Sequence, residues 1–188
     1  MEADIAKRYL EMKDAPLTWD PVNGGKKAFI CFTDSISCGL ASVSNEYMFN
    51  QVADRMMAGQ YYPKDAVEFF GLFQDEKRDI RVGDRILQRA PLLLGLHVWS
   101  MVEIYVAERG DDYCRIGYVT TKNHHGKGIW TATLTSEEGE LRLRVESIAS
   151  PRSFLFWIGL PFARYLQLRA RMRAFQEFTT LLQPKHSL

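Results

Sequence analysis

The loop at residues 120–128, which reads TTKNHHGKG, concentrates side chains that can bind or transfer protons. His124 in this loop can act as a general base or bind an anion. The alternative is that His124 only hydrogen-bonds the backbone of its own loop. His124 and His125 are adjacent, so on an extended backbone they point apart, and no cysteine or acidic ligand lies at the usual spacing for zinc. We therefore predict no metal site here.

Arginines and cysteines are the remaining candidates for chemistry. Arg152 and Arg164 lie in the C-terminal third of the chain, and a guanidinium group there can bind a phosphate or a carboxylate or simply face solvent. The cysteines, Cys31, Cys38 and Cys114, are more typical of small core hydrophobes than of nucleophiles. No Gly-x-Ser-x-Gly elbow occurs. The absence of a recognisable pair of base and nucleophile argues against an enzyme.

A long helix in the stretch Ser150–Leu182 is the element around which the rest of the chain is expected to be arranged. Apolar residues recur there at steps of three and four, the spacing of one helix face: Ile158, Phe162, Tyr165, Leu168, Met172, Phe175 and Leu182. This spacing predicts that Leu168 and Met172 are buried. Pro161 does not suit a helix interior, so a kink or a break is expected near Gly159-Leu160.

Short strands precede this helix. The cleanest signal is the alternation of Leu141, Leu143 and Val145 with charged residues, which predicts one buried and one wet face. Further strands are predicted at 28–32, 81–89, 98–107, 113–121 and 129–135, and short helices at 5–12, 44–57 and 65–73. Short loops between successive strands favour an antiparallel meander. The predicted fold class is α+β, with a curved antiparallel sheet wrapped around the C-terminal helix.

The topology of such a meander predicts where the candidate residues meet. Loop 122–128 joins two adjacent antiparallel strands, so it lies at one edge of the sheet. The turn at 150–152 follows one further reversal and returns to that same edge. We therefore expect His124 and Arg152 to form a polar patch, which Arg164 joins only if the chain bends at Pro161.

Length and composition limit the class of protein. A chain of 188 residues with 46% hydrophobic and 25% charged residues is typical of one globular domain, predicted here as 1–188. A net charge of +1 gives no general attraction to nucleic acid or to an anionic membrane. No apolar run reaches the ~18 residues of a membrane span, and three cysteines without pair spacing do not suggest disulfides. We predict a cytoplasmic protein without a cofactor.

The run GYVTTKNHHGKG, a strand pair and then SPRSFLFWIGLPFARYLQLRARMRAF together resemble domain-of-unknown-function family 1990 of bacteria and plants. The residues that match its pattern are Gly117, Tyr118, Thr120, His124, Gly128, Ser150, Arg164 and Gln167, with Val82-Gly83-Asp84 upstream. Asn123 and Ile129 depart from it, standing where the family usually has Gly and Glu. The resemblance covers roughly 62–178, whereas residues 1–40 are an N-terminal extension only loosely like the family. It implies a START-like, or helix-grip, fold, and such folds often enclose an apolar cavity between sheet and helix.

Three hypotheses about function follow. The first is that the protein binds a small apolar or amphipathic molecule in that cavity, with Thr120, His124, Arg152, Arg164, Tyr165 and Gln167 as candidate ligand-binding residues. The second is an enzyme of hydrolase or cyclase type that uses His124 at the cavity mouth. The third is an interaction module whose cavity is filled by its own side chains. The identity of the ligand and the oligomeric state are left open.

Overall fold

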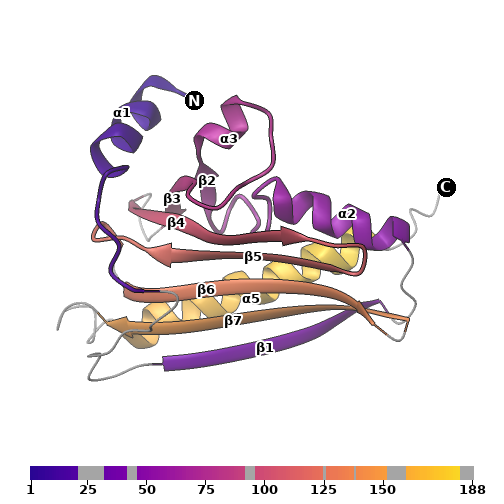
Figure 1. Cartoon of the computed structure of the whole chain (residues 1–188). Helices are drawn as coiled ribbons and strands as arrows, with labels where there is room; N and C mark the ends of the chain where they lie inside the picture. The colour runs from indigo at the N-terminus through magenta and orange to yellow at the C-terminus, as the bar shows by residue number, and fades with distance from the viewer. Residues whose placement is uncertain are drawn as a thin grey trace.

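Seven strands form one antiparallel sheet in the order β1-β7-β6-β5-β4-β3-β2 (Figure 1). This computed structural model describes residues 1–20, 32–41, 46–91, 96–124, 126–137, 139–151 and 160–182. The strands are β1 (Phe32–Ala41), β2 (Glu68–Phe70), β3 (Arg85–Pro91), β4 (His97–Arg109), β5 (Tyr113–Thr120), β6 (Gly126–Glu137) and β7 (Glu140–Pro151). Irregularities in register between Gly39 and Ala41 and between Ile104 and Val106 bend the sheet locally.

Helices cover both faces of this sheet. They are α1 (Ala3–Met12), α2 (Glu46–Met57), α3 (Leu72–Asp75) and α5 (Leu160–Leu182). Adjacent residues of one strand point to opposite faces. Ile86 joins a core shared with α2 and α5, whereas its neighbour Leu87 packs with Ile5 and Tyr9 of α1. The curved sheet therefore grips α5 on one face, and α1 covers part of the other (Figure 1).

Most of the predicted strands are confirmed with shifted ends. The segments 98–107, 129–135 and 141–146 lie within β4, β6 and β7. The segment 81–89 only partly agrees, because residues 82–83 form a turn and β3 begins at Arg85. The strand predicted at 28–32 lies almost wholly outside the described residues, and β1 begins at Phe32. The predicted helix at 44–57 corresponds to α2.

The helix predicted at 65–73 is wrong. Glu68–Phe70 is a strand, paired with Arg89, Gln88 and Leu87 of β3, and a short helix follows it. Phe69 and Phe73 are both buried, which gave the segment an apparent helical spacing. The hydrogen bonds to β3 decide the conformation, since local pattern alone does not separate a short buried strand from a short helix.

The predicted buried face of α5 is right at Phe175, which is buried, but wrong at Leu168 and Met172. Leu168 and Met172 are 37% and 52% exposed, and the residues that pack against the sheet are Ala174, Phe175 and Phe178. The prediction weighed only the large apolar residues. Ala174, which leaves room for the helix to approach the sheet, turns the buried face away from Leu168 and Met172.

The predicted break in the C-terminal helix falls on residues outside the described part of the chain and stays a prediction. Helix α5 begins at Leu160, which places Pro161 in its first turn. A proline costs little there, because its missing N–H would have no partner within the helix. The turn expected at 154–160 lies almost entirely outside the described residues.

Candidate functional site

Thr120 lies at the end of β5, where its side chain joins three segments of the chain. The Gly128 N–H donates to Thr120 Oγ1 at 2.9 Å, and the hydroxyl oxygens of Thr18 and Thr120 lie 2.7 Å apart. The Thr18 N–H also donates to the Thr120 carbonyl at 2.9 Å. Thr120 is buried, so its polar atoms tie the N-terminal segment to β5 and β6.

His124 makes hydrogen bonds within its own loop. The Gly126 N–H donates to His124 Nδ1 at 3.0 Å, and the His124 N–H donates to the Thr121 carbonyl at 3.0 Å. The Thr121 hydroxyl donates to the Met101 carbonyl at 2.8 Å. These bonds agree with the interpretation in which His124 holds the loop.

The end of β7 lies beside this loop, as the meander predicted. Ser150 pairs with Lys127, and Pro151 pairs with Gly126. Arg152 lies outside the described residues. The candidates Arg164, Tyr165 and Gln167 are on α5, but their side chains are outside the description as well, so the polar patch stays a prediction.

Gly128 sets the path of the chain into β6. Its φ is +156°, and a Cβ atom at this position would lie 1.9 Å from the Ile148 carbonyl oxygen of β7. Only glycine avoids that overlap, which explains its place in the 120–128 motif. Gly128 in turn positions Trp130, two residues further along the same strand.

Four aromatic rings form a stack on the face of the sheet that carries α5. Trp130 lies between two tyrosines, with ring centroids 5.1 Å from Tyr118 and 5.1 Å from Tyr61. Phe69 lies 4.8 Å from Tyr61. We call Tyr118, Trp130, Tyr61 and Phe69 the aromatic stack. Tyr118 and Trp130 are register partners on β5 and β6, whereas Tyr61 follows α2, so the stack forms only when the chain is folded.

A small void lies between this stack and α5. Its volume is about 10 Å³, about the least that holds one water molecule. Every residue that lines it is uncharged: Met56, Tyr61, Tyr62, Trp130, Ala132, Leu143, Val145, Ala174, Phe175 and Phe178. The void therefore leaves little space where Ala174, Phe175 and Phe178 of α5 face the sheet, whereas the side chains of residues 161–167 lie outside the description.

Two residues that line the void carry polar side-chain atoms without a hydrogen-bond partner in the described part of the chain. These atoms are the Tyr61 hydroxyl and the Trp130 indole nitrogen, and neither is within hydrogen-bonding distance of an acceptor in the described part of the chain. Tyr61 and Trp130 are 4% and 5% exposed. Burial, followed by the nearby Tyr118 and Tyr62, raises the pKa of Tyr61 well above its usual value, so the hydroxyl keeps its proton. Both groups are therefore buried hydrogen-bond donors.

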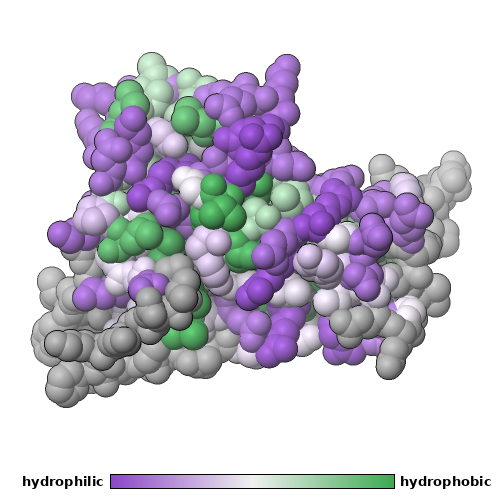
Figure 2. Space-filling view, in the orientation of Figure 1, coloured by the Kyte–Doolittle hydropathy of each residue, from purple (hydrophilic) through white to green (hydrophobic). Residues whose placement is uncertain are grey.

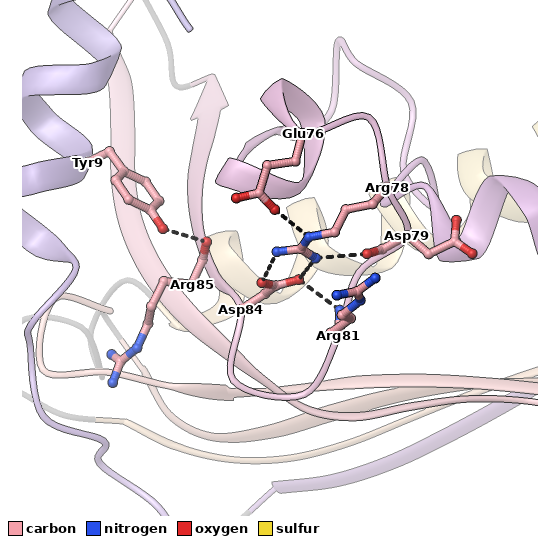
Figure 3. Close-up of polar contacts among 7 residues, drawn as sticks. All are labelled: Tyr9, Glu76, Arg78, Asp79, Arg81, Asp84 and Arg85. Atoms are coloured by element: carbon pink, nitrogen blue, oxygen red, sulfur yellow. Dashed lines mark hydrogen bonds and ion pairs between the residues drawn. The ribbon is translucent and has the colours of Figure 1, made fainter.

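The charged groups around Asp84 form hydrogen bonds that hold the turn before β3 in place (Figure 3). Arg78 donates to both carboxylate oxygens at 2.7 and 2.8 Å, and the Arg81 N–H donates at 2.7 Å. Burial opposes ionisation of Asp84, but these donors outweigh it and lower the pKa of the carboxyl group. Arg85 likewise pairs with Glu103 at 2.6 Å, as expected for residues that bond to their neighbours. This cluster holds the turn.

Neither a metal nor a reactive thiol is indicated by the described residues. Within the described ranges, no group of three or more His, Cys, Asp or Glu side chains is placed to hold a metal ion. Burial raises the pKa of the Cys114 thiol to about 11. A thiol with that pKa stays protonated at neutral pH and is a poor nucleophile.

The family model for a domain of unknown function, DUF1990, matches residues 40–177. The chain belongs to this family. The match begins before the predicted 62–178 and leaves the N-terminal helix α1 outside the DUF1990 domain. No curated protein sequence matches the chain significantly.

Solved structures share the fold of this DUF1990 protein at low sequence identity. A major latex-like protein from Panax ginseng has a TM-score of 0.54 at 7% identity, over 82% of this chain and 99% of its own. An uncharacterised protein from Rhizobium leguminosarum has a TM-score of 0.53 at 12% identity, over 81% and 96%. Protein Ms6760 from Mycobacterium smegmatis has a TM-score of 0.52 at 14% identity, over 82% and 93%. At these identities the likeness supports the helix-grip fold alone.

The surface of this DUF1990 protein is mainly hydrophilic on the face shown in Figure 2, with separate apolar patches. Among the described residues, no helix is long and apolar enough to cross a membrane.

The sequence analysis missed Tyr61 and Trp130. Tyr118 was noticed only as part of the family's pattern, and Trp130 was read as part of a strand. The only available signal was the clustering of aromatic residues near two strand ends, and it does not show which rings meet.

Proposed function

We propose that this protein binds a small amphipathic molecule between its sheet and α5, in contact with the aromatic stack. The observation that carries the proposal is the pair of buried donors on Tyr61 and Trp130. A buried donor without an acceptor costs free energy, about 1–3 kcal/mol per group. A ligand that offers a hydrogen-bond acceptor removes that cost, so its binding to the empty protein is favoured.

The helix-grip fold supports this proposal by analogy, because it places the stack where such folds often enclose a ligand. The void of about 10 Å³ is too small for a molecule of several atoms. On this proposal α5 moves away from the sheet when the ligand enters. Thr120, His124, Arg152, Arg164, Tyr165 and Gln167 stay predicted ligand contacts at the mouth, and a cytoplasmic location stays a prediction.

A second candidate function is an interaction module that carries no ligand. The small volume of the void favours it, since the described side chains leave little space between the sheet and the part of α5 that carries Ala174, Phe175 and Phe178. The hydrolase or cyclase hypothesis has less support, because His124 Nδ1 lies 3.0 Å from both the backbone nitrogen and the carbonyl oxygen of Gly126 and so holds its own loop.

Native mass spectrometry of the protein as purified separates the first two functions. We expect a bound species whose mass exceeds that of the chain by a small molecule, and the excess disappears under denaturing conditions. A chain that is always empty, together with no change in melting temperature across a library of amphipathic compounds, would support the interaction module instead.

A further inference from the structure

The chemistry of the void determines which end of a ligand it accepts. Trp130 contributes an indole N–H, which only donates, and Tyr61 contributes a hydroxyl that keeps its proton. Both groups therefore need a hydrogen-bond acceptor. Resting on the proposed function, we propose that the ligand inserts an uncharged carbonyl oxygen, which accepts hydrogen bonds from Tyr61 Oη and Trp130 Nε1.

The charge of the wall excludes an ionic group. None of the ten residues around the void carries a charge at neutral pH. A carboxylate or an ammonium group would leave water without a counter-ion, which is strongly unfavourable in an apolar site. An ammonium group also has no lone pair to accept a hydrogen bond, so it would leave the Tyr61 and Trp130 donors without a partner.

The size and shape of the void exclude a ring. A volume of about 10 Å³ admits a single small group. Both faces of Trp130 are already covered, by Tyr61 and by Tyr118, so a ligand ring does not stack on the indole. The group that reaches the donors is therefore the narrow tip of the molecule, and the rest lies in space that α5 opens.

A carbonyl oxygen fits this site better than a hydroxyl group. Either oxygen can accept from two donors. A hydroxyl also carries its own proton, which needs an acceptor. If the Tyr61 oxygen accepts that proton, the Tyr61 O–H can no longer donate to the ligand oxygen, so one of the three protons stays without a partner. An alcohol therefore satisfies the buried donors of the protein but leaves a buried proton without an acceptor, which costs free energy again.

Four compounds with the same skeleton test this inference: acetophenone, 1-phenylethanol, isopropylbenzene and benzoate. Their dissociation constants are measured by ligand-observed NMR titration of the full chain. We expect acetophenone to bind about a hundredfold more tightly than isopropylbenzene, about tenfold for each of the two recovered hydrogen bonds. The alcohol is expected to fall between them, and benzoate to bind most weakly.

The variant Tyr61→Phe removes one donor and keeps the ring. It should weaken acetophenone binding about tenfold and leave isopropylbenzene binding unchanged. Tyr113→Phe is the matched control, because Tyr113 is an exposed residue of β5 outside the void, and it should change neither constant. A downfield ¹³C shift of the acetophenone carbonyl on binding gives a readout that needs no variant.

The outcomes separate this inference from the proposed function. Equal binding of acetophenone and isopropylbenzene, with no carbonyl shift, overturns the carbonyl site but leaves ligand binding intact; a bridging water molecule between the donors would give this result. Tight binding of benzoate overturns the carbonyl site as well. No binding of any compound at its solubility limit, together with an empty native mass spectrum, overturns both.

Discussion

The Tyr61 hydroxyl stands apart from the other described tyrosine side chains because it is both buried and without a protein partner. The hydroxyl of Tyr9, for example, donates to the Arg85 carbonyl at 3.3 Å. A hydroxyl group retained at such a cost is typical of a residue kept for function rather than for stability. Stability and binding should therefore respond to the same substitution in opposite directions.

We predict that Tyr61→Phe stabilises the empty protein. The change removes a desolvated donor and keeps the ring that packs on Trp130 and Phe69, so the free energy of unfolding should rise by about 1 kcal/mol. Urea denaturation followed by tryptophan fluorescence measures this. Tyr9→Phe is the control, since it removes a hydroxyl that has a partner and should lower the free energy of unfolding slightly. A loss of stability in Tyr61→Phe would mean that the hydroxyl is satisfied.

The sequence led to polar residues of one loop and not to the buried donors Tyr61 and Trp130. Thr120 and His124 were found because hydroxyl and imidazole groups in a glycine-containing loop are typical of binding sites. In the structure their side chains form hydrogen bonds with Gly128, Thr18 and Gly126. Tyr61 and Trp130 were missed because they are distant in sequence, and a missing hydrogen-bond partner is a property of the folded chain alone.

Helix α5 shows why a correct element can be given the wrong face. Its existence could be predicted from the spacing of its apolar residues, and Pro161 lies in its first turn, where a proline is tolerated. Its rotation could not, because apolar residues surround more than one side of the helix. Contact with β6 and β7 selects the side that carries Ala174, Phe175 and Phe178.

The free energies of two substitutions on α5 should reflect this rotation. Phe178→Ala removes a ring that is 3% exposed and should lower the free energy of unfolding by about 3–5 kcal/mol. Met172→Ala removes a side chain that is 52% exposed and should cost less than about 0.5 kcal/mol. Chemical denaturation of both variants measures the difference. Equal decreases in the free energy of unfolding for the two variants would show that Met172 is buried, as the sequence predicted.

The turn before β3 makes the free energy of unfolding depend on pH in the acidic range. The lowered pKa of Asp84 stabilises the folded state when the carboxylate is ionised. That contribution is complete above the unfolded pKa of about 3.9 and is lost as the pH falls through the lower folded pKa. We predict that Asp84→Asn costs about 1.5–3 kcal/mol at pH 7, the range for hydrogen bonds to a charged group.

The pH dependence of Asp84→Asn provides the internal control. Because the wild type loses the contribution of Asp84 in acid, the difference between the two proteins should shrink as the pH is lowered from about 5 to about 2. Unfolding in urea at several pH values checks this. A difference that is constant over that range would assign the loss to packing and not to charge.

The whole molecule is larger than the DUF1990 domain, because the N-terminal segment closes part of the second face of the sheet. Ile5 and Tyr9 pack on Leu87 and Met101, and the Arg8 guanidinium lies 4.9 Å from the centre of the Trp99 ring. Arg85 donates to the Ala15 carbonyl at 2.7 Å. These contacts make residues 1–20 part of one folded unit.

We predict that α1 unfolds together with the rest of the protein. Ile5→Ala should lower the free energy of unfolding by about 2 kcal/mol within a single transition, because it removes a buried side chain. Leu10→Ala on the same helix is the control, since Leu10 is 60% exposed and should contribute little. Hydrogen exchange should protect α1 to the same extent as β3. A separate early transition would show that α1 docks independently.

The position of β1 has a consequence for synthesis on the ribosome. β1 lies at one end of the strand order and pairs only with β7, so that Phe32 meets Ala149. More than a hundred residues must be translated before that partner exists. At about 5–20 residues per second, the nascent β1 waits roughly 6–23 s without its neighbour. Although β1 leaves the ribosome before the other described strands of the sheet, it is thus among the last of them to be incorporated, and the sheet grows toward β1 from the strands translated after it.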